Sequence, residues 1–445
     1  MPIKLRLLLV LLTFSFGVSA QTFNAARLDS FLTLLEENNK MMGSLTITKA
    51  GRQEFSKAYG YSSINDRTAS DPETKYRIGS ISKMFTSVMI FQLIEEGKLT
   101  LATKLSDFFS EIPNANQITI SRLLNHQSGL YNFTNDSTYL EWNTRKRGRQ
   151  EILELIKGYE PSFKPGKKSE YSNTNYVLLG YIIEEITGKT YTEELKSRIT
   201  DKIGLKNTFV GSTIAHESGD ALSFNFIGKN WEPESETDMS IPGGAGAIIS
   251  TPGDLTTFIE ALFTSGKLLN EESLSQMTVI KDGYGYGIFK FPFYKHFSYG
   301  HTGGIDGFNS MVAYFPDDSV AVAFTGNGMN YPMNDIVLNA LRIYYDMPFT
   351  MPVFTAYSIS PQDLIKYEGI YSSSGFPLKI TIKSEEDILT AQATGQPSFP
   401  LDAVSDTEFK FDPAGVVLIF IRAPDGNINE VTLQQRGRSF LLKKE

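Results

Sequence analysis

The sequence predicts an α/β (α+β) fold, in which an antiparallel sheet is flanked by helices and carries a mainly helical subdomain, followed by a small C-terminal β-barrel. Two features of the chain predict this arrangement. Helical and strand-like periods alternate up to about residue 345, and short strands alone follow residue 361. Met347–Pro361 contains three prolines and little periodicity, so we expect a linker at 347–360.

In the first part, apolar residues recur at helical spacing in some segments and in short strand-like runs in others. The helical segments end at glycines, such as Gly97 and Gly188, where a helix stop is expected. The expected elements are a helix over 28–35, strands at 45–49 and 55–61, helices over 80–96 and 175–186, strands at 309–315 and 320–325, and a helix over 335–345.

The C-terminal part contains closely spaced runs of strand-forming residues. Several short strands at regular spacing are typical of a small barrel or sandwich. The expected strands are Gly369–Tyr371, Leu378–Ile382, Ile388–Gln392, Phe409–Phe411, Val416–Arg422, Glu430–Leu433 and Phe440–Leu442.

Residues 1–20 have the parts of a secretory signal peptide. Lys4 and Arg6 precede an apolar run, and the segment ends in Val18-Ser19-Ala20. The apolar run is too short to span a bilayer. We therefore expect cleavage before Gln21, a periplasmic or secreted mature chain over 21–445, and no membrane span after the signal is removed.

The composition excludes several function classes. The chain has no cysteine, so neither disulfides nor a thiol nucleophile are available. Its net charge is −8, which argues against nucleic acid as a partner. The basic cluster at 145–149 is interpreted as a solvated surface. Four histidines occur without zinc-site spacing, so we expect no metal ion or other cofactor.

The first candidate site is Ser80-Ile81-Ser82-Lys83, at the predicted start of a helix. Residues three apart share a helix face, so Lys83 can reach the Ser80 hydroxyl. The helix N-terminus also favours negative charge that develops during attack. By itself the pattern is also compatible with Ser80 acting only as a helix cap.

Two further segments carry polar groups that suit the same chemistry. Tyr171-Ser172-Asn173 precedes a predicted helix, and a tyrosine beside an ammonium can be driven toward phenolate and relay a proton. His301-Thr302-Gly303-Gly304 lies before a predicted strand pair. Glycines there allow a substrate to lie against a strand edge, and the NH of Gly304 can join that of Ser80 in an oxyanion hole. The alternative for the first segment is a tyrosine packed at a helix entrance with Asn173 as a cap. The alternative for the second is a turn between strands.

Together, in this order, these segments resemble the serine β-lactamase and penicillin-binding-protein superfamily, in particular class C β-lactamases. Further stretches that resemble the family are 123–130, 243–246, 250–255 and 284–287. The likeness covers roughly residues 25–345, which places a hydrolase domain at 21–346. The C-terminal part, 361–445, resembles the small lipocalin-like barrels appended to some of these hydrolases.

The resemblance implies a role for each motif residue. Ser80 would be the nucleophile, Lys83 its base, and Tyr171 a partner base and leaving-group acid. Asn173 would hold the substrate carbonyl, while Thr302, Gly303 and Gly304 line the strand edge. His301 replaces the lysine usual in β-lactamases, so carboxylate binding should weaken as pH rises through the titration of His301. His126, in one of the family-like stretches, is interpreted as a packed structural histidine.

The expected activity is hydrolysis through an acyl-enzyme on D-alanyl peptides or related amides and esters, as in D-Ala-D-Ala carboxypeptidases. The alternatives are a carboxylesterase, a class C-type β-lactamase and, from another class, a non-catalytic sensor of penicillins or peptidoglycan. A pure binder needs no nucleophile, which argues against the sensor. The expected partners are therefore a small peptide, ester or β-lactam, with peptidoglycan as a further candidate.

Overall fold

A computed structural model describes residues 23–445 except 229, 355–356, 386 and 436. The predicted signal peptide, 1–20, lies outside the described residues. Within the described part, the central sheet runs in the order β10-β11-β12-β13-β1-β2, with antiparallel neighbours, and β7 and β8 extend it beside β13. The strands are β1 (Met41–Lys49), β2 (Arg52–Tyr59), β7 (Phe224–Ile227), β8 (Asn230–Pro233), β10 (Phe289–Phe293), β11 (His296–Ile305), β12 (Phe308–Phe315) and β13 (Val320–Met329).

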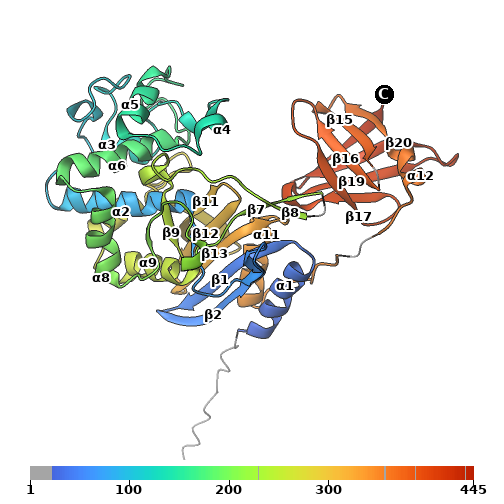
Figure 1. The fold of residues 1–445 in the computed structure, drawn as a ribbon, viewed down its shortest axis with the longest axis horizontal. Helices are drawn as coiled ribbons and strands as arrows, with labels where there is room; N and C mark the ends of the chain where they lie inside the picture. The colour runs from blue at the N-terminus through green and yellow to red at the C-terminus, as the bar shows by residue number, and fades with distance from the viewer. Residues whose placement is uncertain (1–22, 229, 355–356, 386, 436) are drawn as a thin grey trace, which may run out of the picture.

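Alternating side chains of the sheet enter two separate cores, as the twofold period of a strand requires. On β13, Val320, Val322 and Phe324 pack under the two helices at the ends of this domain, α1 (Ala25–Glu37) and α11 (Met333–Tyr344). Ala321 and Ala323 face the opposite core, which includes α2 (Ser82–Glu95), α6 (Asn173–Thr187) and α9 (Pro252–Thr264). Figure 1 shows the sheet between these two sets of helices.

The helical subdomain lies above the sheet, beside the N-terminal half of α6 (Figure 1). Its short helices precede and follow residues 125–135 in the chain, a segment that carries residues of the site described below. They are α3 (Ile120–Leu124), α4 (Tyr139–Trp142) and α5 (Arg149–Gly158). Beyond α6 follow α7 (Tyr191–Leu195), α8 (Asp201–Ile203) and, after α9, α10 (Glu271–Met277). Small sheets join β3 (Tyr61–Ser63) to β4 (Thr68–Ala69), and β9 (Ile248–Ser250) to both β5 (Tyr76–Arg77) and β6 (Phe209–Val210).

The C-terminal strands close into a barrel, as predicted, in the order β14 to β21. A short helix, α12 (Pro361–Leu364), precedes it. The strands are β14 (Gly369–Ser373), β15 (Phe376–Glu385), β16 (Ile388–Ala393), β17 (Phe399–Ala403), β18 (Glu408–Phe411), β19 (Val416–Arg422), β20 (Ile428–Gln435) and β21 (Arg438–Lys444). Strand β17 was not predicted, because its five residues include Pro400 and Asp402, two residue types that are rare in strands.

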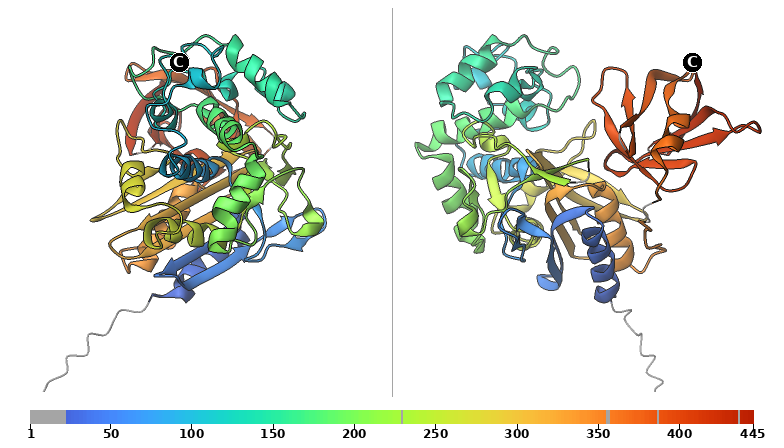
Figure 2. Two further views of the ribbon diagram at one scale, coloured as in Figure 1. Left: turned by 90° about the vertical axis from the view of Figure 1, so that its left-hand side faces the viewer. Right: turned by 45° about the vertical axis from the view of Figure 1, so that its right-hand side comes forward.

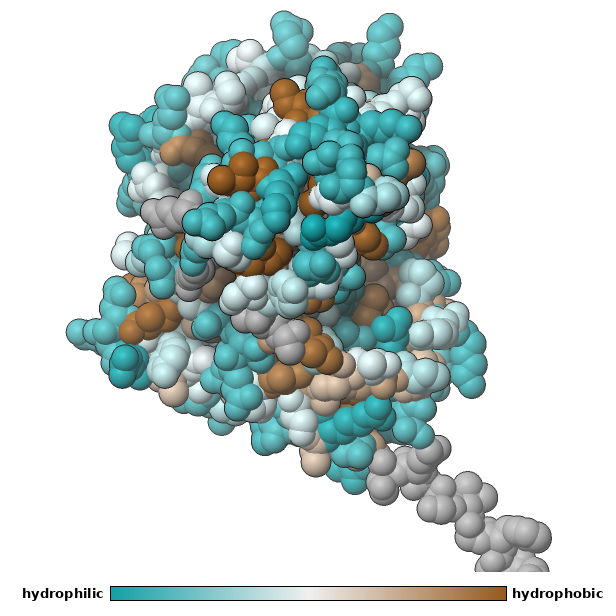
Figure 3. Space-filling model, turned by 90° about the vertical axis from the view of Figure 1, so that its right-hand side faces the viewer, coloured by the Kyte–Doolittle hydropathy of each residue, from teal (hydrophilic) through white to brown (hydrophobic). Residues whose placement is uncertain are grey.

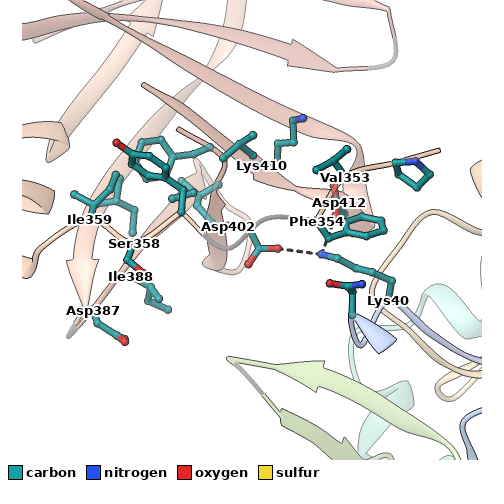
Figure 4. A pocket seen from close by; sticks show the side chains of 18 of the residues that line it. Lys40, Val353, Phe354, Ser358, Ile359, Asp387, Ile388, Asp402, Lys410 and Asp412 are labelled. Carbon is teal, nitrogen blue, oxygen red and sulfur yellow. Dashed lines mark hydrogen bonds and ion pairs between the residues drawn. The ribbon is translucent and has the colours of Figure 1, made fainter. Parts of the chain in front are cut away.

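The barrel lies on the opposite side of the molecule from the helical subdomain, as Figure 1 and the right-hand view of Figure 2 show. Lys40, which precedes β1, joins the two parts. Its ammonium lies 3.2 Å from Asp402 and 2.9 Å from Asp412 of the barrel, beside a cavity of about 720 Å³ (Figure 4).

On the side that Figure 3 shows, apolar groups are scattered among hydrophilic side chains. Among the described residues, no helix is both long and apolar enough to cross a membrane.

Candidate active site

Ser80 lies in a 3₁₀ turn, Gly79–Ile81, immediately before α2. The α-helix therefore begins two residues later than predicted, at Ser82. The turn is held from outside, because the Ile78 N–H donates to the Ile248 carbonyl and the Ile248 N–H donates to Ser82 Oγ. Ser80 does not cap the helix, since neither the turn nor α2 has a side-chain cap. Its hydroxyl is instead available to Lys83.

Lys83 is fully buried, and its amine nitrogen has three oxygen neighbours. Nζ lies 2.9 Å from Ser80 Oγ, 2.7 Å from Asn173 Oδ1 and 2.8 Å from the Ala245 carbonyl oxygen. Burial lowers the pKa of Lys83 well below its usual range. A neutral amine donates two hydrogen bonds, which the amide oxygen and the carbonyl oxygen accept. Its lone pair then faces the Ser80 hydroxyl, as a general base requires.

Asn173 is oriented from the helical subdomain. Its side-chain Nδ2 donates to Thr134 Oγ1 at 3.0 Å, and its backbone N–H donates to Asn132 Oδ1 at 2.9 Å. These contacts direct Oδ1 toward Lys83 and leave one N–H of the amide for a substrate. Asn132, Thr134 and Ala245 were not predicted as site residues. Only Ala245 carried a signal, because it lies in the family-like stretch 243–246.

Tyr171 lies two residues before α6, with its hydroxyl close enough to that of Ser80 for the contact to lower the Tyr171 pKa. Lys83 Nζ lies over the Tyr171 ring, 4.9 Å from its centre. Burial raises the pKa of Tyr171 above its ordinary value. The phenolate that the sequence suggested is therefore disfavoured. Removal from water penalises the charged phenolate more than the neutral phenol. With its pKa raised, Tyr171 suits the role of a proton donor.

His301 to Gly304 lie within β11, so the alternative that they form a turn is wrong. The strand β10 pairs with β11 only as far as Gly300, and within the described residues no strand continues this edge along 301–305. Gly303 must be glycine here, because a Cβ would lie 2.0 Å from the Ile78 carbonyl oxygen. The exposed Gly304 lies against the turn that carries Ser80, since a Cβ on Gly79 would lie 2.8 Å from Gly304 N.

The His301 ring is buried beside Phe289 and Tyr171, with ring centres 4.7 Å and 6.4 Å away. Burial lowers the pKa of His301 to about 3. Its Nδ1–H donates to the Thr302 carbonyl oxygen, which leaves Nε2 of the neutral ring as an acceptor. The predicted weakening of carboxylate binding near neutral pH is therefore not expected, because His301 is already neutral there.

The eight predicted site residues thus converge on one place between β11, the start of α2 and the start of α6. A family model described as Beta-lactamase matches residues 34–345. The chain belongs to the beta-lactamase family. It is a serine hydrolase with this family's fold, and the barrel lies beyond the matched residues. Within the described residues, no group of three or more histidine, aspartate or glutamate side chains could hold a metal ion.

Several proteins are similar to this chain, mainly over its hydrolase part. The teichoic acid D-alanine hydrolase of Staphylococcus aureus (strain MRSA252) is 27% identical over 296 residues, which is 64% of this chain and 70% of the relative. A D-stereospecific amidohydrolase from Streptomyces sp. is 26% identical, with a TM-score of 0.63, over 72% of this chain and 98% of that one. The octameric penicillin-binding protein homologue from Pyrococcus abyssi, 24% identical with a TM-score of 0.66, shares the fold over 94% of this chain and 100% of its own.

Proposed function

We propose that the protein hydrolyses D-alanyl esters and amides through an acyl-enzyme on Ser80. The observation that carries this proposal is the position of Lys83, a buried amine whose Nζ lies 2.9 Å from Ser80 Oγ and whose other oxygen neighbours are Asn173 Oδ1 and the Ala245 carbonyl oxygen. This arrangement removes the serine proton without a histidine or a metal ion.

In the first step, Ser80 Oγ attacks the substrate carbonyl carbon as its proton passes to Lys83. The backbone N–H groups of Ser80 and Gly304 stabilise the oxyanion. The tetrahedral intermediate then collapses, the bond to the leaving oxygen or nitrogen breaks, and the Tyr171 hydroxyl donates a proton to that atom. The proton on Lys83 restores the Tyr171 hydroxyl. Water hydrolyses the resulting ester by the same steps, and Ser80 regains its proton.

Asn173, His301, Thr302 and Gly303 form the proposed binding surface. The free N–H of the Asn173 amide donates to a substrate carbonyl, and the open edge of β11 offers backbone groups along Thr302–Gly304. Because neutral His301 presents an acceptor at Nε2 rather than a cation, it suits a substrate N–H group better than a carboxylate. We therefore place D-alanyl esters and amides ahead of peptides that end in a free D-alanine carboxylate.

The substrate class also agrees with the names of two relatives, a teichoic acid D-alanine hydrolase and a D-stereospecific amidohydrolase. The test is a matched panel of the p-nitrophenyl ester and p-nitroanilide of D-alanine, the same pair from L-alanine, and D-alanyl-D-alanine. We expect the D-alanyl ester to react fastest and the L-alanyl pair at least about tenfold more slowly. Equal rates on D and L compounds would overturn the proposed stereochemistry and favour a general carboxylesterase.

A further inference from the structure

His126 lies behind Tyr171 and contacts the chain on both sides of it. The His126 carbonyl oxygen accepts from the Glu170 N–H at 2.9 Å, and its ring Nδ1 accepts from the Ser172 N–H at 3.2 Å. The ring itself packs on the Tyr171 ring, with centres 4.5 Å apart. The residues immediately before and after Tyr171, and its side chain, are thus all held by one residue.

The acceptor state of this imidazole is fixed by a directed chain of hydrogen bonds. The Leu130 N–H donates to Ser128 Oγ, whose hydroxyl donates to Asn175 Oδ1 at 2.6 Å. The Asn175 amide then turns its Nδ2 toward His126 Nδ1, at 3.3 Å. Two donors therefore face Nδ1, which requires the neutral ring with its proton on Nε2. Burial acts in the same direction, because it lowers the pKa of His126 well below its usual range.

The backbone of His126 is also unusual. Its φ is +59°, in the left-handed region. Residues with a Cβ adopt this region at a cost in free energy, which is smaller for asparagine than for most. Glycine would fill this turn without that cost, so the presence of histidine is consistent with a use for its ring.

We propose that His126 is a positioning residue, which holds Tyr171 beside Ser80 without touching substrate itself. This inference rests on the proposed function, because it assigns His126 an effect through Tyr171. It goes beyond the packing role that the sequence suggested. A displacement of about 1 Å at a proton donor can lower a rate by about a hundredfold, so the effect belongs in kcat rather than in KM.

The experiment compares His126→Phe, which keeps a ring but removes the Nδ1 acceptor, with His126→Asn, which keeps an acceptor and suits a positive φ. His296→Phe is the matched control, since His296 also packs on a tyrosine, Tyr345, but on another part of the sheet. Turnover of the D-alanine p-nitrophenyl ester is measured per site titrated by a serine-directed fluorophosphonate. We expect kcat to fall about a hundredfold in His126→Phe and about tenfold in His126→Asn, with KM within threefold and His296→Phe unchanged.

A double-mutant cycle with Tyr171→Phe decides whether His126 acts through Tyr171. If it does, adding His126→Phe to Tyr171→Phe lowers kcat by less than about threefold. If the kcat losses of the two single variants multiply in the double variant, the two residues act independently and the proposal is overturned. A His126→Phe enzyme with wild-type kcat would also overturn it. If His126→Phe yields no folded protein, the same cycle is run with His126→Asn. A Tyr171→Phe enzyme with full activity would instead refute the proposed function, so the two failures are distinguishable.

Discussion

Ser80 Oγ and Lys83 Nζ lie 2.9 Å apart across the junction between a 3₁₀ turn and α2. A nucleophile and its base are therefore supplied by a single turn of chain, while the groups that set the state of the base come from elsewhere. Asn173 Oδ1 and the Ala245 carbonyl oxygen accept hydrogen bonds from it, and the surrounding core buries it.

Replacing the nucleophile should abolish turnover. We expect Ser80→Ala to lower kcat on any accepted ester or amide by at least about a thousandfold, because no other nucleophile lies beside Lys83. Circular dichroism checks that the fold is intact. A folded Ser80→Ala protein with a near wild-type rate would refute the assignment of Ser80.

The depressed pKa of Lys83 predicts the pH dependence of acylation. The base is the neutral amine, and its fraction falls as pH drops through a pKa that lies well below the usual value for lysine. Acylation by the D-alanyl ester, followed as a pre-steady-state burst, should therefore level off at a lower pH than an ordinary lysine would allow, and stay level to pH 10. Lys83→Arg, which cannot lose its proton, should show no burst. A rate that keeps rising tenfold per pH unit toward pH 10 would indicate an ordinary lysine.

His301 should control the preference between neutral and carboxylate-bearing substrates. With a pKa of about 3, its ring is neutral throughout the range from pH 5 to 8. We expect KM for D-alanyl-D-alanine to be flat over this range, and His301→Lys to lower it about tenfold by adding a permanent cation. His296→Lys, on the same strand, is the control. A wild-type KM that rises through pH 6 to 7 would show that His301 titrates as an exposed histidine.

Benzylpenicillin distinguishes the proposed hydrolase from a β-lactamase. The opened β-lactam ring keeps its leaving nitrogen attached to the acyl group, where it obstructs the water that Lys83 and Tyr171 would activate, so we expect the penicilloyl ester on Ser80 to be long-lived. Intact-mass spectrometry after minutes of incubation should show one added penicilloyl mass, which is absent in Ser80→Ala. Rapid multiple-turnover hydrolysis would favour the β-lactamase, and the absence of any adduct would favour the carboxylesterase.

Lys40 should hold the barrel against the hydrolase sheet. Burial opposes its charge, but Asp412 and Asp402 together outweigh that cost and raise the pKa of Lys40. We expect Lys40→Met to speed proteolytic cleavage within the proposed linker, 347–360, by about tenfold, since the aspartates lose their counter-ion. The esterase kcat should not change. Lys57→Met, which breaks an exposed pair with Asp29, is the control, and equal cleavage of both variants would contradict a clamp at Lys40.

Local pattern in the sequence was enough to predict the architecture and the principal site residues. The period of apolar residues predicted α1, β12, β13, α11 and most barrel strands, because strand and helix periods are properties of a few consecutive residues. The spacing of Ser80 and Lys83 predicted their contact for the same reason. The order of the three motifs then indicated the family, which the match over 34–345 confirms.

Tertiary structure alone decided the state of those residues. The Ala245 carbonyl and the Asn173 amide reach Lys83 from 162 and 90 positions along the chain, and no local period encodes such an approach. The lowered pKa values of Lys83 and His301, and the raised pKa of Tyr171, follow mainly from the burial of these groups in the assembled core. Desolvation depends on every element packed around a group, so it becomes defined only when the helices, the sheet and the turn before α2 are in place.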